Sequence, residues 1–148
     1  MIALIQRVQK ACVEVEGSCI GEIGLGILAL VGVEKRDDKA QADRLLQRIL
    51  GYRIFADRDD KMNLSLNDTG GGLLLVPQFT LVADTRKGMR PSFSTAAEPD
   101  KGRNLFEYLG QQAKEKHSQV AFGQFGADMQ VTLTNDGPVT FWLQTNAS

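Results

Sequence analysis

Alternation of apolar and polar residues is the dominant pattern of this chain and predicts β-strands over much of its length. It is clearest in the opening residues 1–9 and 12–16, and a Gly17-Ser18 turn predicts that residues 19–23 return as a hairpin strand. Residues 24–33 form a short apolar run between glycines, which is typical of a buried strand. The expected strands cover residues 1–9, 12–16, 19–23, 24–33, 52–57, 73–84, 119–124, 128–134 and 139–145.

Two segments change to the helical period. In the first, Asp37 or Asp38 can cap a helix that Gly51 closes, and its apolar residues recur at spacings of three and four. The second runs from about Glu98 to Lys116, with a proline in its first turn, where the missing N–H costs nothing. The apolar stripes of the two helices are Ala42, Leu45, Leu46, Ile49 and Leu50, and Leu105, Phe106, Leu109 and Ala113.

Pro77 lies inside the most apolar strand segment, "LLLVPQFTLVAD" (73–84). Proline cannot donate a ladder hydrogen bond, so we expect the strand to break, bulge or reach an edge there. Strands dominate, the two helices are far apart in sequence, and several connections resemble hairpins. This pattern favours an α+β fold in which two helices pack on a mostly antiparallel, barrel-like sheet, with residues 1–148 forming a single domain.

Composition narrows the function classes. Net charge is −1, from 17 basic and 18 acidic residues, so any contact with nucleic acid must be local. The best basic cluster is Arg86, Lys87 and Arg90, for which a solvated loop is the alternative interpretation. No stretch approaches the ~18 consecutive apolar residues of a membrane span, and the first strand does not resemble a signal peptide. We therefore expect a cytoplasmic protein without a membrane partner.

Common cofactor and metal motifs are missing from the sequence. There is one histidine, His117, placed to end the second helix, and the two cysteines do not form a CxxC pair, so we expect no metal site. The acidic run Asp57, Asp59 and Asp60 lacks the glycine and closing glutamate of a calcium loop and is typical of a solvated turn. Neither a GxxxxGK[ST] loop nor a strand–GxGxxG–helix unit occurs, so we expect no nucleotide cofactor.

Polar residues at strand ends remain as candidates for chemistry. Gln78 and Thr80 lie beside Pro77, and Asn135 and Thr140 flank a Gly-Pro dipeptide. With exposed backbone amides, such groups suit the positioning of a substrate and of a developing oxyanion more than proton transfer. Thr80 has no adjacent base, which favours a binding or packing role over a nucleophile. By itself, "NDGPVT" (135–140) is typical of a hairpin turn.

Two short motifs together resemble the signature motifs of the D-aminoacyl-tRNA deacylase family. They are "PQFTL" (77–81) and "NDGPVT" (135–140). The resemblance extends along the whole chain through "IQRVQKACV" (5–13), "KGMRPSF" (87–93) and "FGADMQV" (125–131). The first motif of the family usually begins with serine, which Pro77 replaces here with the loss of a hydroxyl and a backbone donor.

This resemblance implies a homodimeric proofreading hydrolase that needs no cofactor and binds the 3′ end of aminoacyl-tRNA. It would cleave the ester of a D-amino acid, or of glycine mischarged on tRNA-Ala, with participation of the 2′-hydroxyl of the terminal adenosine. The implied catalytic residues are Gln78, Phe79 and Thr80, the chiral filter is a cis Gly137–Pro138 peptide that enters the active site of the partner subunit, and the supporting residues are Arg7, Asn135, Thr140 and Met129.

A main-chain filter agrees with the residue types. Glycine lets the backbone approach a ligand closely, and a cis bond before proline costs only ~0.5–1 kcal/mol. Two alternatives stay open at this stage: an editing relative that acts on L-aminoacyl-tRNA with a trans Gly137–Pro138 bond, and a non-catalytic RNA-binding module. The near-neutral charge and the few aromatic residues count against the second alternative.

Overall fold

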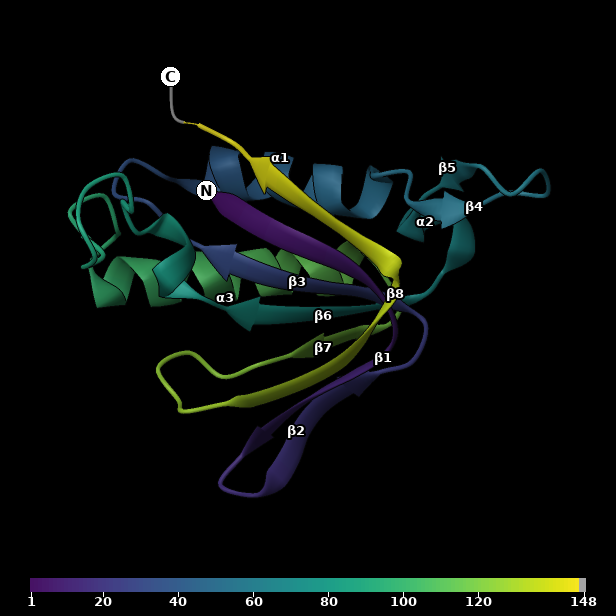
Figure 1. Ribbon diagram of the computed structural model, residues 1–148, viewed down its shortest axis with the longest axis horizontal. Coiled ribbons are helices and arrows are strands. Elements are labelled where there is room, and N and C mark those ends of the chain that lie inside the picture. The colour runs from purple at the N-terminus through teal and green to yellow at the C-terminus, as the bar shows by residue number, and fades with distance from the viewer. Residues whose placement is uncertain (147–148) are drawn as a thin grey trace.

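The computed structural model describes residues 1–146, which form a strongly curled sheet with the two long helices on one face (Figure 1). The strands are β1 (Ile2–Val15), β2 (Ser18–Ile23), β3 (Gly26–Gly32), β4 (Phe55–Ala56), β5 (Met62–Leu64), β6 (Gly72–Pro77), β7 (Val120–Phe122) and β8 (Gln130–Gln144). The helices are α1 (Lys39–Gly51), α2 (Leu66–Thr69) and α3 (Pro99–Lys116), with a 3₁₀ turn η1 (Phe79–Val82).

Strand β1 organises the main sheet. Its first half pairs with β3, its second half pairs with β2, and β8 follows it on the other side, all antiparallel. Beyond β3 the sheet continues through β6 and β7, both in parallel register. The expected α+β class with a barrel-like sheet is confirmed, and parallel pairing within residues 1–146 is confined to β3, β6 and β7. The small β4–β5 hairpin lies apart from this sheet.

Each face of the sheet buries its own apolar cluster. On one face, β1, β3 and β6 pack against the apolar stripes of α1 and α3 that the helical period predicts. On the other face, the curled sheet closes over Val8, Val13, Leu28, Leu74 and Val76. Because β3 and β6 are buried on both faces, they read as continuous apolar runs without alternation.

Helix boundaries follow the expected capping chemistry. Asp38 is the N-cap of α1: its side chain accepts from the Ala40 N–H at 2.9 Å, and Gln41 completes a capping box. Asp37 instead lies buried against the amino group of Met1 at 2.8 Å. Helix α3 begins at Pro99, as predicted.

Several boundaries differ from the sequence prediction. Residues 1–9 and 12–16 form the single strand β1, and the predicted strand 52–57 shrinks to β4. The predicted loop 57–72 contains β5 and the short helix α2, whose signal was the capping box of Ser65 and Asp68. The strands expected at 128–134 and 139–145 are one strand, β8, so "NDGPVT" is not a hairpin turn.

The break predicted at Pro77 is confirmed, since β6 ends there and η1 follows. The strand is central, yet proline fits for a reason visible in the hydrogen bonds. Leu73 N–H donates toward β7, and Gln78 N–H donates to Val31 in β3, so an N–H at position 77 would also point toward β7. Strand β7 ends at Phe122, and no ladder bond is lost.

Within residues 1–146, no helix is both long and apolar enough to cross a membrane.

Candidate functional site

An apolar pocket of about 530 Å³ opens where β6 ends. Gln78 and Phe79 form one wall, Ala97 lies just before α3, Phe106 lies within α3, and Phe125 lies in the segment before β8. Among residues 1–146, its lining carries no charged side chain, and Gln78 supplies its only side-chain amide. Ligand sites of this size are commonly apolar with few polar groups, so this pocket is the candidate site.

Gln78 and Thr80 meet at the rim of this pocket. The Gln78 main-chain N–H donates to the Val31 carbonyl at 2.7 Å, which fixes the turn that follows β6. Its side-chain amide donates to the Thr80 hydroxyl, which is exposed. Among the described residues no histidine, carboxylate or amine contacts Thr80, so the structure supplies no base to activate it as a nucleophile.

Phe79 places an aromatic side chain and an N–H group beside Gln78. Its ring is 62% exposed and contacts the Phe93 ring, with the centroids 5.2 Å apart. Within residues 1–146 the main-chain N–H groups of Phe79 and Thr80 have no hydrogen-bond acceptor, as expected for the first residues of a helical turn. Adjacent N–H groups without acceptors are suited to stabilise a negatively charged oxygen.

Met129 lies at the floor of the same pocket. Its sulfur accepts from the Gln124 N–H at 3.4 Å, and a Cβ added to Gly123 would meet that sulfur at 3.0 Å and the Pro77 ring at 3.3 Å. Pro77 is therefore part of a close apolar contact with the segment before β8, which gives the residue a packing role.

The Gly137–Pro138 segment is a bulge in β8. Gln6 pairs with Thr140 and Val8 pairs with Asn135, so the residues 136–139 stand opposite Arg7 alone. A register shift of this kind pushes the extra residues out of the sheet. The Gly137–Pro138 peptide bond is cis, and both residues are exposed.

The side chain of Arg7, in the neighbouring strand β1, fixes the position of this bulge. Its Nε donates to the main-chain oxygen of Asp136 at 3.2 Å and lies 3.3 Å from the Asp136 carboxylate, while Nη1 donates to the Ile54 carbonyl at 2.8 Å. Gly137 adopts φ +128°, and an added Cβ would lie 2.7 Å from Cγ2 of Val139 and 3.1 Å from Nη2 of Arg7. Both the backbone angle and the space therefore require glycine.

Asn135 and Thr140 close the base of the bulge. Asn135 donates its side-chain amide to the Thr140 hydroxyl at 2.9 Å and accepts from the Val139 N–H at 3.0 Å. The structure thus brings Arg7, Asn135 and Thr140 together around Gly137–Pro138, and it brings Gln78, Phe79, Thr80 and Met129 together at the pocket.

These two groups are separated within one chain. Arg7 pairs with Ile27 of β3, and Ile27 pairs with Leu73 of β6. The bulge therefore lies at the height of Leu73, which is four residues before Pro77, or about 13 Å along the strands. Strands β1 and β3 also separate β8 from β6, which adds about 14 Å across the sheet. Figure 1 agrees, since the bend of β8 and the end of β6 lie at opposite ends of the sheet.

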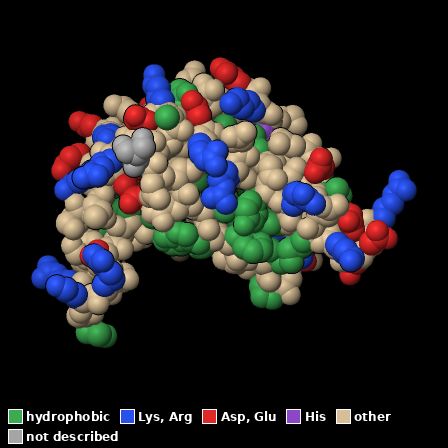
Figure 2. Space-filling view, turned by 90° about the horizontal axis from the view of Figure 1, so that it is seen from above, with side chains coloured by type: hydrophobic (Ala, Val, Ile, Leu, Met, Phe, Trp, Pro, Cys, Tyr) green, Lys and Arg blue, Asp and Glu red, His purple; other side chains and the backbone are tan. Residues whose placement is uncertain are grey.

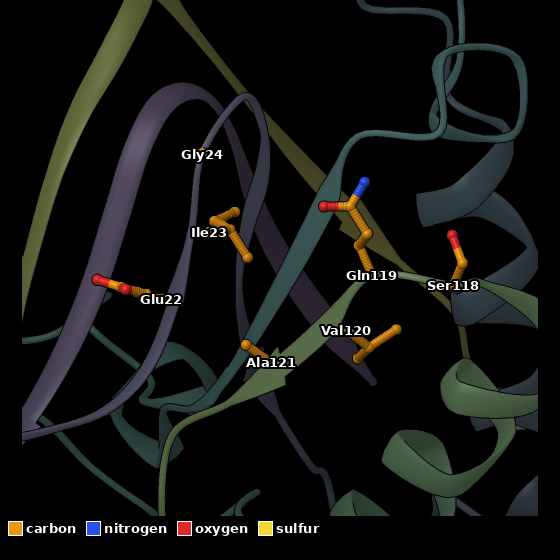
Figure 3. Close-up of a pocket in the computed structure, with 7 residues that line it drawn as sticks. All are labelled: Glu22, Ile23, Gly24, Ser118, Gln119, Val120 and Ala121. Atoms are coloured by element: carbon orange, nitrogen blue, oxygen red, sulfur yellow. The ribbon is translucent and has the colours of Figure 1, made fainter.

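A second pocket, of about 540 Å³, opens at the seam between the sheet edges β2 and β7 (Figure 3). Figure 3 shows the Glu22 carboxylate pointing away from Ser118 and Gln119, so the polar groups do not converge. Gln119 donates instead to the Gly70 carbonyl at 2.9 Å. Among the residues that Figure 3 labels, the polar side chains do not meet, unlike Gln78 and Thr80 at the rim of the first pocket.

The remaining sequence candidates have structural roles. His117 is the C-cap residue of α3, as predicted, and its Nε2 lies 2.6 Å from the Gly71 carbonyl oxygen. Asp57 accepts the N–H groups of Asp59 and Lys61, and these bonds lower the pKa of its carboxyl group. Sequence reasoning did not find Ile54, Phe93 or Phe125, because an apolar side chain or a carbonyl carries no local signal of a site.

The family model and the curated relatives name the same family of proteins. The model of the family described as D-Tyr-tRNA(Tyr) deacylase matches residues 4–144. A Thioalkalivibrio sulfidiphilus (strain HL-EbGR7) protein named D-aminoacyl-tRNA deacylase is 65% identical over 144 residues, covering 97% of each chain.

Solved structures share the fold of this chain. One titled c-Myc DNA Unwinding Element Binding Protein superposes with a TM-score of 0.95 at 35% identity, covering 99% of this chain and 100% of the other. A second, titled as a probable eukaryotic D-amino acid tRNA deacylase, has a TM-score of 0.83 at 16% identity and covers 96% and 97% of the two chains, a similarity of fold.

Proposed function

The chain belongs to the D-Tyr-tRNA(Tyr) deacylase family, and we propose that its activity, hydrolysis of the ester between a D-amino acid and tRNA, takes place in the pocket at the end of β6. The reaction is a proofreading step that releases free tRNA and the free D-amino acid. Water adds to the ester carbonyl carbon, the bond to the ribose oxygen breaks, and that oxygen takes a proton.

The proposal rests first on the two N–H groups of Phe79 and Thr80 at the rim of the pocket. The carbonyl oxygen of the ester gains negative charge as water adds, and these two donors belong to successive residues of one turn. An aminoacyl ester is already activated, so positioning and oxyanion stabilisation suffice without a side-chain nucleophile. In this mechanism Gln78 and Thr80 position the substrate, and the 2′-hydroxyl of the terminal adenosine assists.

We assign stereochemical selection to the Gly137–Pro138 segment of a second copy of the chain. Within one chain this segment is on the order of 20 Å from Pro77 by strand spacing, so a chain cannot place its own bulge in its own pocket. A homodimer in which each bulge enters the other pocket solves this geometry. The exposure of both residues supports their use at such an interface.

A filter made of main chain explains how one site could accept many different D-amino acids. The backbone at Gly137 and Pro138 would occupy the space that an L side chain needs, which is exclusion by a steric clash. A D side chain points elsewhere and is never contacted by the filter. Glycine has no side chain to exclude, so glycyl-tRNA, including glycine mischarged on tRNA-Ala, would also be a substrate. Because the substrate belongs to translation, we place the protein in the cytoplasm.

Matched D-tyrosyl-tRNA and L-tyrosyl-tRNA test the proposal. We expect the D ester to be hydrolysed at least about 100-fold faster, which corresponds to roughly 2.8 kcal/mol of discrimination. Equal hydrolysis of both esters would favour an editing enzyme for L-aminoacyl-tRNA, and binding without hydrolysis would favour an RNA-binding module. The dimeric state at assay concentration, measured by light scattering, tests the shared site.

A further inference from the structure

A basic arm, residues 84–92, projects from the body of the protein beside the pocket. Its base is closed by two main-chain hydrogen bonds between Asp84 and Ser92, of 2.7 and 3.0 Å. Thr95 fixes the returning strand by donating its hydroxyl to the Val82 carbonyl at 2.8 Å. Gly88, at φ +65°, turns the chain at the tip. The arm therefore has a defined base and a free tip.

The segments just before and just after this arm both line the pocket. Phe79 precedes the arm and lines the pocket, and Ala96 and Ala97 follow it and line the same pocket. The contact between the rings of Phe79 and Phe93 ties the two sides together. Whatever occupies the pocket and extends outward therefore passes close to the arm.

The basic side chains of the arm differ in whether an acidic group within residues 1–146 pairs with them. Arg86 is held by the Asp84 carboxylate, with its Nη2 at 2.8 Å and its Nε at 2.9 Å, and this pairing lowers the pKa of Asp84 to about 2. Lys87 and Arg90 have no hydrogen-bond or ion-pair partner within residues 1–146, and Met89 between them is fully exposed. In Figure 2, basic side chains gather on a projection at the left end, where Figure 1 places this loop.

We propose that Lys87 and Arg90 bind phosphate groups of the tRNA where its 3′ strand leaves the pocket. This inference rests on the proposed function. The pocket lining contains no charged side chain, so attraction for a polyanion has to come from outside it. A guanidinium fork suits two oxygens of one phosphate, and an ammonium acts as a point charge. Arg86 is paired with Asp84 and stabilises the arm. Lys87 and Arg90 are therefore the cations that can bind the ligand.

The double variant Lys87→Gln, Arg90→Gln tests this assignment. Its matched control is Arg44→Gln, Lys116→Gln, which removes the same charge from exposed positions. Lys116 is at the end of α3 opposite Pro99, which lines the pocket, about 25 Å away along the helix axis. Each protein is assayed on D-tyrosyl-tRNA and on the D-tyrosyl ester of adenosine, which has no phosphate, over a series of salt concentrations.

We expect the arm variant to lose about tenfold in kcat/KM on D-tyrosyl-tRNA through KM, with kcat unchanged. The slope of log kcat/KM against log salt should become shallower by about 1.5, as for two lost phosphate contacts. Activity on the adenosine ester, the melting temperature and the control variant should stay as in the wild type. An equal loss on the adenosine ester, an unchanged salt slope, or the same loss in the control would overturn the inference. Failure of the wild type to prefer D-tyrosyl-tRNA would instead refute the proposed function.

Discussion

Arg7 contacts Asp136 twice, through a hydrogen bond of 3.2 Å from Nε to the main-chain oxygen and an ion pair of 3.3 Å to the carboxylate. The two residues are 129 positions apart in sequence. Through this contact a side chain of the first strand sets the position of a segment in the last strand. The segment itself, Gly137–Pro138, has no polar side chain with which to fix its own position.

Replacing Arg7 with alanine should weaken stereochemical selection more than folding. The side chain is 16% exposed and bonds to Ile54 and Asp136, so we expect a loss of about 2 kcal/mol in the free energy of unfolding. Hydrolysis of L-tyrosyl-tRNA should rise about tenfold relative to the D ester. Arg7→Lys is the informative companion, because it keeps the charge but replaces the two guanidinium nitrogens that bond Asp136 and Ile54 separately with a single nitrogen. Full discrimination in a folded Arg7→Ala protein would contradict the proposed role.

Gly137→Ala should displace the bulge. The added Cβ meets Val139 at 2.7 Å, and the backbone angle of φ +128° is strained for any side chain, so a cost of about 1–3 kcal/mol is expected. The ratio of L to D hydrolysis should rise. Gly51→Ala is the control, since nothing lies within 4 Å of its added Cβ; there we expect unchanged activity and stability within about 1 kcal/mol.

Thr80→Val distinguishes positioning from nucleophilic catalysis. Valine removes the hydroxyl that accepts from Gln78 but keeps the two main-chain N–H donors. We expect kcat to fall by less than about tenfold, whereas loss of a true nucleophile costs about a thousandfold or more. A single-turnover assay on D-tyrosyl-tRNA gives the chemical step directly, and a covalent adduct on Thr80 would refute the positioning role.

Tyr108 should make stability fall at high pH. Its hydroxyl donates to Asp43 at 2.7 Å, and this bond, burial and the nearby Glu115 raise its pKa above 10.0. A raised pKa means that the folded state favours the protonated form, so its contribution is full below pH 10 and is lost as pH rises through the folded-state value. Tyr108→Phe should lower the melting temperature at pH 8 and differ less from the wild type at pH 11.

Local sequence patterns were sufficient to predict the two long helices and the end of β6. The apolar periods, the N-cap Asp38 and the first-turn Pro99 gave both long helices within a residue or two. Pro77 marked the end of β6 because a missing donor has the same consequence in any context. Gln78 and Thr80 entered the prediction as polar residues at a strand end and Phe79 through the motif resemblance, whereas the pocket beside them was not predicted.

The bulge in β8 could not be predicted from its own residues. Asn, Asp, Gly and Pro in succession are typical of a turn, and only pairing with β1 on both sides shows that the strand continues. Ala97 and Phe125 line the pocket, and Phe93 contacts Phe79, only through the tertiary fold; the motifs that contain Phe93 and Phe125 do not indicate these contacts. Parallel pairing of β3 with β6 likewise depends on a crossover through α1, which strand patterns do not specify.

The pairing of β1 with β8 joins the first described strand to the last, so it can form only late in synthesis. Arg7 leaves the ribosome early, whereas Gly137–Pro138 emerges after every other helix and strand segment except the end of β8. Long-range contacts between β1 and β8 must form before the bulge is held in place, and such contacts form slowly. A nascent chain therefore carries the residues of its pocket well before it carries the segment we assign to substrate selection.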